Sequence, residues 1–228
     1  MSDTRTNAGV DSISTFRKMH VWSKPGERVV VLLTAGNLAT TQSVVSLLDE
    51  RTKAVSERTP TLLETPSMYQ TARLVGNTVK EVIASSAPEG QTADSYFNAS
   101  FILGGQIRGS KPRLFMIYPE GNFIEASDDT PFFQIGETKY GKPIIIRAYD
   151  RTMSFAETAK LLLVSFDSTL KSNLSVGLPL DLFFYEQDTL KPGLKKRIDR
   201  DDPYYRTISE GWSDALKNAF KSLPDFPE

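Results

Sequence analysis

An acid and a base lie close to the start of this chain. Asp3 and Lys18 stand fifteen positions apart across a turn-rich, polar stretch, where most domains have a frayed and expendable end. A carboxylate can fix the position of a lysine, and the charge of that lysine can lower the pKa of a nearby nucleophile. Taken alone, such a pair is more often a surface salt bridge of little energetic value.

A glycine follows the first strongly apolar run. Residues 28–35 are mainly β-branched residues and leucine, which predicts a buried strand, and Gly36 comes directly after them. A glycine between a strand and a helix can leave a backbone N–H free for a developing oxyanion, although it more often only ends the strand. With Asp3 and Lys18, this set lacks only a nucleophile. In N-terminal nucleophile hydrolases the nucleophile is residue one, and its own α-amine is the general base.

The composition limits the alternatives. The 228 residues include 27 basic and 28 acidic side chains, so charge gives no general attraction to nucleic acid or to an anionic membrane. The chain has no cysteine and a single histidine, His20, which argues against a thiolate site, a Ser-His-Asp triad and a multi-histidine metal site. No apolar run approaches a membrane span, and the start lacks the apolar core of a secretory signal. We therefore expect a cytoplasmic protein without a metal or organic cofactor.

Periodicity predicts a mixed architecture. We expect strands over residues 28–35, 101–107, 113–118, 123–126, 132–135 and 179–185, and a charged loop over 190–202. We expect helices from Thr40 or Thr41 to about 57, from about 67 to a stop at 87–90, from the S-x-x-E box at Ser154 to about 170, and from Pro203 onward. Runs of helices between antiparallel strands indicate a layered α+β fold, and residues 1–228 read as a single domain.

Several blocks of sequence carry a resemblance. They are residues 2–11, 13–19, 35–42, 104–105, 111–115, 120–125, 166–177 and 179–182. Their order resembles the proteasome β-subunit family, and more closely the bacterial proteasome-like peptidases called Anbu. The resemblance runs from residue 2 to near the C-terminus.

The resemblance implies a fold, an activity and an assembly. The fold would be an αββα sandwich of two antiparallel sheets between helical layers, and the activity would be threonine-type hydrolysis of peptide or other amide bonds. Subunits would associate with each other into a ring-like or open helical oligomer. By position, Asp3 and Lys18 match the acid and lysine of the family, and Gly36 matches its oxyanion-hole glycine. Asn173 and Ser175 lie near its supporting acid and hydroxyl, although proteasome subunits carry an acid where this chain has Asn173.

The start of the chain departs from the family pattern. The family begins with a threonine and a first strand, whereas this sequence starts at the Ser-Asp-x-Arg block, about fourteen residues late. Thr4 and Thr6 cannot replace that threonine, because trimming the chain to either one removes Asp3. A misplaced start and an inactive truncation both explain the difference. In either case we expect a groove or an unpaired sheet edge beside Asp3 and Lys18.

Three functions remain open at this point. The first is a threonine peptidase subunit, and the second is a catalytically inactive subunit for assembly or peptide binding. The third is a hydrolase or transferase of small non-protein amides, because one fold can host varied amide chemistry.

Overall fold

Two main antiparallel sheets and several helices make up the fold. The computed structural model describes residues 1–7, 13–53, 61–86 and 98–227. The helices are α1 (Leu38–Lys53), α2 (Met68–Ser86), α3 (Lys142–Ala148), α4 (Phe155–Ser172) and α5 (Pro203–Lys221). The expectation of antiparallel strands with runs of helices is confirmed at this level. No helix within the described ranges is both long enough and apolar enough to cross a membrane.

The larger sheet is a meander of five strands. In order these are β4 (Met19–Lys24), β5 (Arg28–Gly36), β6 (Ala99–Ile107), β7 (Arg113–Ile117) and β8 (Phe123–Glu125). The central pair β5–β6 is in register from Arg28↔Ile107 to Gly36↔Ala99. Gly105 of β6 lies so close to β5 that a Cβ there would overlap the Val29 carbonyl oxygen. This close approach explains a glycine in the middle of a strand.

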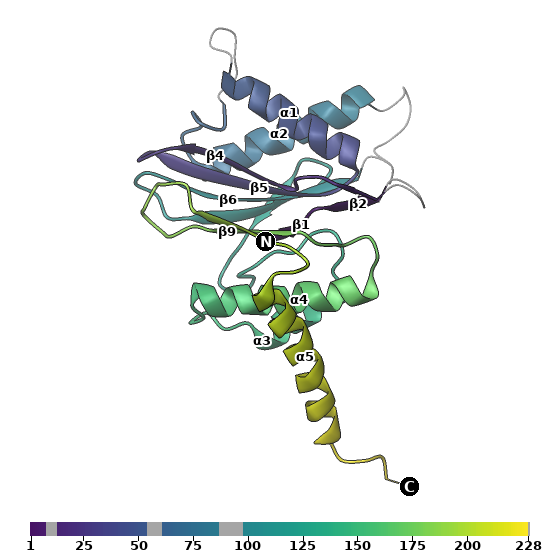
Figure 1. Cartoon of the computed structure of the whole chain (residues 1–228). Helices are drawn as coiled ribbons and strands as arrows, with labels where there is room; N and C mark the ends of the chain where they lie inside the picture. Colours follow the sequence, from purple (N-terminus) through teal and green to yellow (C-terminus); the bar gives the residue numbers. More distant parts are fainter. Residues whose placement is uncertain (8–12, 54–60, 87–97, 228) are drawn as a thin grey trace.

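Helices α1 and α2 cover one face of the five-stranded sheet (Figure 1). Their buried residues recur every three or four positions, as expected of an amphipathic helix. On α1 these include Val44, Val45 and Leu48, and on α2 they include Val75 and Val79. They pack with inward residues of the sheet into the larger hydrophobic core.

A second sheet lies on the other side of the meander (Figure 1). Its order is β1 (Ser2–Asp3), β9 (Leu180–Phe184) and β10 (Leu194–Ile198). Helices α3 and α4 lie beyond this sheet, and a smaller core joins Leu163 of α4 to Leu180 and Ile198 of the sheet. A two-stranded ladder of β2 (Arg5–Asn7) and β3 (Ile13–Thr15) follows β1.

One strand prediction and one loop prediction were wrong. Residues 132–135 form no strand, and their apolar side chains line a cavity between the sheets instead, which periodicity alone cannot distinguish. The predicted loop 190–202 contains β10, an edge strand held by its ladder with β9 and by the 2.8 Å pair of Arg197 with Asp181. Lysines and arginines are common on such edges, so their charge misled the loop prediction. The predicted end of the first helix near 57 and the stop at 87–90 lie outside the described residues.

One buried amide connects the two sheets. Gln106 of β6 is fully buried, and its Nε2 donates to the Ser110 carbonyl oxygen at 2.7 Å and to Asp188 Oδ1 at 2.6 Å. Its Oε1 accepts from the Tyr185 hydroxyl at 2.6 Å and from the Asp188 N–H at 2.8 Å. All four hydrogen-bonding positions of the amide are therefore used, and they hold the β9–β10 loop against the β6–β7 turn.

We predict that Gln106→Leu lowers the free energy of unfolding by about 3 kcal/mol, because it removes the four hydrogen bonds of this buried amide. Gln187→Leu is the matched control, since Gln187 is exposed in the same loop, and it should change stability by less than about 0.5 kcal/mol. Urea unfolding of both variants measures the difference. Equal urea midpoints for the two variants would contradict the linking role of Gln106.

Candidate active site

Asp3 and Lys18 form a shielded ion pair between the two sheets. Asp3 is placed by the pairing of β1 with β9, in which it lies opposite Leu180. Lys18 directly precedes β4, and its carbonyl oxygen accepts the Thr34 N–H of β5 at 2.9 Å. Lys18 Nζ lies 2.7 Å from Asp3 Oδ1, and the two side chains are only 21% and 10% exposed.

The second oxygen of the Asp3 carboxylate is also bound. Asp3 Oδ2 accepts the Arg5 N–H at 3.1 Å and the Gly177 N–H at 3.2 Å. A carboxylate that accepts this many donors is held in one orientation. The pair therefore differs from an ordinary surface salt bridge, such as the exposed Lys24–Glu27 pair of this chain.

Gly36 presents its backbone to the same place. Its φ of +107° suits glycine, and a Cβ there would overlap the Asn98 carbonyl oxygen. Along β5 the Thr34 N–H bonds toward β4, whereas the Asn37 N–H bonds toward β6, to the Asn98 oxygen at 2.8 Å. Because N–H directions alternate along a strand, the Gly36 N–H faces the β4 edge, beyond the strand start at Met19.

Asn173 and Ser175 form a compact turn after α4. Asn173 is the C-cap of that helix, and its Oδ1 accepts the N–H and the hydroxyl of Ser175 at 2.8 and 2.6 Å. Its Nδ2 donates to Glu137 Oε2 at 2.7 Å. The Lys139 N–H, and then the Asn173 amide, hold the pKa of the Glu137 carboxyl below its usual range. In the same turn, the Arg5 guanidinium donates to the Leu174 carbonyl oxygen at 3.0 Å.

A cavity of about 880 Å³ joins most of these groups. The cavity is lined by Asp3, Lys18, Gly36 and Ser175. Asn173 does not line it, but its side chain accepts the hydrogen bond of the Ser175 hydroxyl. Beside the cavity β1 is an edge strand, paired within the described residues only with β9. The expected groove and open sheet edge next to Asp3 and Lys18 are thus confirmed.

Glu137 and Gly177 belong to this arrangement, and sequence reasoning missed both. Glu137 lines the cavity, but it follows residues 132–135, which were wrongly predicted to form a strand. It also lies far from its partner Asn173 in sequence. Gly177 was part of a recognised block, and its role became visible only in three dimensions. A Cβ at Gly177 would overlap the Arg5 guanidinium, so a larger residue there would displace the Arg5 side chain.

Two threonines and the terminal amine lie close to Asp3 in sequence. Thr4 is fully buried and its hydroxyl donates to the Pro179 carbonyl oxygen at 2.8 Å, so it is committed to a structural contact. Thr6 lines the cavity, as does Met1. Burial lowers the pKa of the Met1 amine to about 6, against the opposing effect of Asp181. Among the described residues no cluster of His, Cys, Asp and Glu could hold a metal ion.

Known structures match the whole of this architecture. No protein-family model matches the chain, and no curated protein does. Anbu from Hyphomicrobium sp. strain MC1 is 54% identical, with a TM-score of 0.91 over 100% of this chain and 94% of the other. Anbu (ancestral beta-subunit) from Yersinia bercovieri is 50% identical, with the same TM-score and coverage.

The chain belongs to the Anbu family. A third Anbu structure, described as the helical assembly of the Anbu complex from Pseudomonas aeruginosa, is 47% identical with a TM-score of 0.91. It covers 100% of this chain and 92% of the other. The resemblance inferred from the sequence blocks is therefore confirmed, and the Anbu family is proteasome-like.

His20 also lines the cavity of this Anbu-family chain. It lies on β4, half-buried, and stacks on Trp22 with ring centroids 6.1 Å apart. Burial lowers the pKa of the imidazole below 6.5, and Asp49 opposes this shift only in part. We predict that the neutral form of His20 predominates at pH 6.5. Because it is the only histidine, its imidazole proton resonance can be followed without assignment.

The lowered pKa of His20 has a consequence for stability. Below pH 6.5 the unfolded chain binds a proton that the folded chain resists, so stability is lost as pH falls from 6.5 toward the folded pKa. We expect His20→Phe to lose less stability over this range than the unmodified chain, as measured by urea unfolding at several pH values. An imidazole midpoint at or above 6.5 would refute the prediction.

Proposed function

We propose that this chain is a subunit of a proteasome-type, N-terminal nucleophile hydrolase that cleaves peptide bonds. The observation that supports it best is the Asp3–Lys18 pair, held at 2.7 Å beside a large cavity that Gly36 also lines. A lysine fixed in this way is suited to tune a nucleophile by its charge. We also propose the four-layer αββα fold of that superfamily, which is supported by the order of α1 and α2, the two sheets, and α3 and α4 (Figure 1).

In this mechanism a threonine hydroxyl attacks the amide carbonyl carbon, and its proton passes to the threonine α-amine. The oxyanion that develops is stabilised by the Gly36 N–H, and Lys18, positioned by Asp3, keeps the centre electropositive. The amine returns the proton to the leaving nitrogen, and the C–N bond breaks. Water then hydrolyses the acyl ester. Asn173 and Ser175 would act as supporting groups that keep the cavity wall in place, together with Glu137.

We further propose that the intact protein supplies the threonine ahead of Met1. The family pattern predicts a first strand there, and the open edge of β1 beside the cavity offers backbone groups for such a strand to pair with.

Self-association is part of the proposal. The Pseudomonas aeruginosa relative is described as a helical assembly, and we propose that this chain also forms an oligomer of identical subunits. We propose a peptide as the substrate, since apolar side chains of the five-stranded sheet, of residues 132–135 and of α4 line the cavity and would receive apolar side chains of a peptide.

The central test compares two proteins, the chain as given and the chain extended upstream to a mature N-terminal threonine. We predict that an amide-mimicking β-lactone adds its acyl mass only to the extended protein, as measured by intact-mass spectrometry. Lys18→Ala in the extended protein should slow this addition by about 100-fold or more, since the nucleophile loses its tuning charge. Lys24→Ala, which removes the lysine of an exposed pair, should leave the rate unchanged.

Other outcomes separate the remaining functions. An extended protein that binds peptides but never forms an adduct would contradict the peptidase proposal and favour a binding or assembly subunit. Adduct formation with turnover of small amides, but not of peptides, would favour the third function. Circular dichroism of each variant confirms that a loss of labelling does not reflect unfolding.

A further inference from the structure

The C-terminal helix α5 is covered by the rest of the chain over only half of its length. Asp202 caps its start by accepting the Tyr205 N–H at 2.9 Å, and the buried Tyr205 hydroxyl bonds to Asp167 of α4 at 3.2 Å. Trp212 donates to Ser168 of α4 at 3.3 Å. This first half therefore packs on α4 through an apolar stripe that includes Tyr205 and Trp212.

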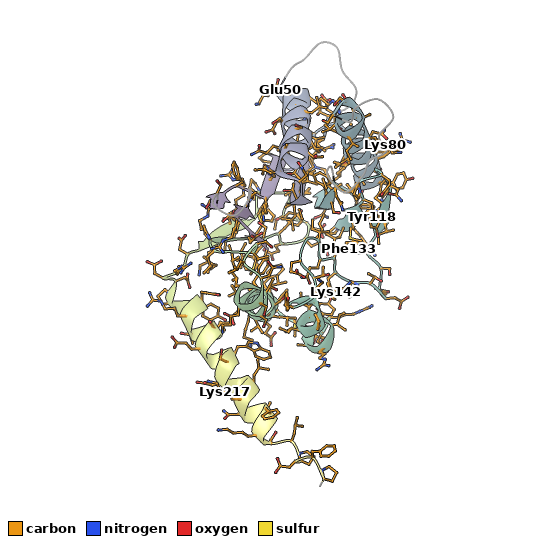
Figure 2. All side chains as sticks on the ribbon, turned by 90° about the vertical axis from the view of Figure 1, so that its right-hand side faces the viewer. Glu50, Lys80, Tyr118, Phe133, Lys142 and Lys217 are labelled. Atoms are coloured by element: carbon orange, nitrogen blue, oxygen red, sulfur yellow. The ribbon has the colours of Figure 1, made fainter. Side chains whose placement is uncertain are left out.

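The same stripe continues beyond the contact with α4. Leu216, Ala219 and Phe220 follow Trp212 on one side of the helix, and Leu223 extends the line just past its end. All residues from 214 to 227 are exposed, with Leu216 at 51%, Phe220 at 77% and Leu223 at 64%. Figure 1 shows this half standing away from the body, and Figure 2 shows Lys217 on it. An apolar stripe of this kind marks a contact surface.

We propose that a second copy of this chain covers the stripe, with the two α5 helices antiparallel about a two-fold axis near residues 217 and 218. In this register Leu216 lies opposite Ala219 of the partner subunit, and Phe220 lies opposite the partner's Ala215. Each large side chain then meets a small one, which lets two helices pack closely. A two-fold contact requires such self-complementarity, and the stripe provides it.

The spacing of the stripe supports a helix pair. Trp212, Leu216, Ala219 and Leu223 are separated by four, three and four positions, the spacing of a two-helix seam. The charged residues of this half, Asp214, Lys217 and Lys221, lie on the opposite side of the helical wheel. Pairing of the stripes therefore buries no charge.

Charge also favours a protein partner over a membrane surface. Between residues 214 and 225 two lysines are balanced by Asp214 and Asp225, so this half lacks the basic face that binds anionic lipid. The antiparallel arrangement also places the tip of each helix beside the body of the other subunit. There Leu223 would meet the partner's Trp212, at the point where α5 leaves α4.

This inference sharpens the self-association that we propose above, and it is independent of the peptidase proposal. It assigns the contact to the second half of α5, which contributes no residue to the cavity. Charge variants on the stripe can therefore abolish the contact without touching the site.

The first test measures molar mass against concentration by analytical ultracentrifugation. We expect Leu216→Glu and Phe220→Glu to weaken self-association by about 30-fold or more, the scale of a central interface residue. Asn218→Glu is the matched control on the opposite side of the helix and should have little effect. If both stripe variants assemble like the unmodified chain, the α5 contact is overturned while self-association stands. A monomeric unmodified chain would overturn both.

The second test measures the register. The chain has no cysteine, so single cysteines can be introduced without background. A mixture of Leu216→Cys and Ala219→Cys chains should oxidise mainly to the mixed dimer, because these positions lie opposite each other in the antiparallel arrangement. Lys217→Cys, on the charged side, should remain largely uncrosslinked. Preferential linking of Leu216→Cys to itself would indicate a parallel pair and overturn the proposal.

Discussion

The coordination of one carboxylate holds the site together. Asp3 accepts the Lys18 ammonium on one oxygen and the N–H groups of Arg5 and Gly177 on the other. Three separate parts of the chain meet there: the edge strand β1, the entry to β4 and the loop before β9. A partly buried carboxylate needs such donors to offset its lost hydration. Because these donors must all reach the Asp3 carboxylate, Lys18, the loop at Gly177 and strand β1 are fixed relative to each other.

Beside this carboxylate the two sheets do not close on each other. The cavity between them is bounded by apolar side chains of β5, β6 and α4, and its charged side chains include Asp3, Lys18 and Glu137. At the far end the Gln106 amide ties the loops of both sheets with four hydrogen bonds. The fold is thus pinned at both ends by polar contacts and left open at the edge where Asp3 lies. Such an opening next to a fixed ion pair is suited to receive a strand and a substrate.

Much of the fold could be predicted from the sequence, because strong periodicity and local signals agree. The Ser154 capping box, the apolar run 28–35 and the stripe of α2 all form as expected. The failures have physical causes as well. Residues 132–135 are apolar because they line a cavity, and β10 is charged because it is an edge. The last helix begins at Pro203 as predicted, but only its first half is covered within the chain.

The sequence by itself determined the family, the candidate residues Asp3, Lys18 and Gly36, and the absence of cysteine chemistry. These follow from residue types in order along the chain. Only the tertiary structure decided that Gly177 completes the setting of Asp3, and that Glu137 holds Asn173. Contacts between residues more than thirty positions apart leave no periodic or local signal. They arise when the sheets and loops come together, and the need to satisfy buried polar groups then selects the partners.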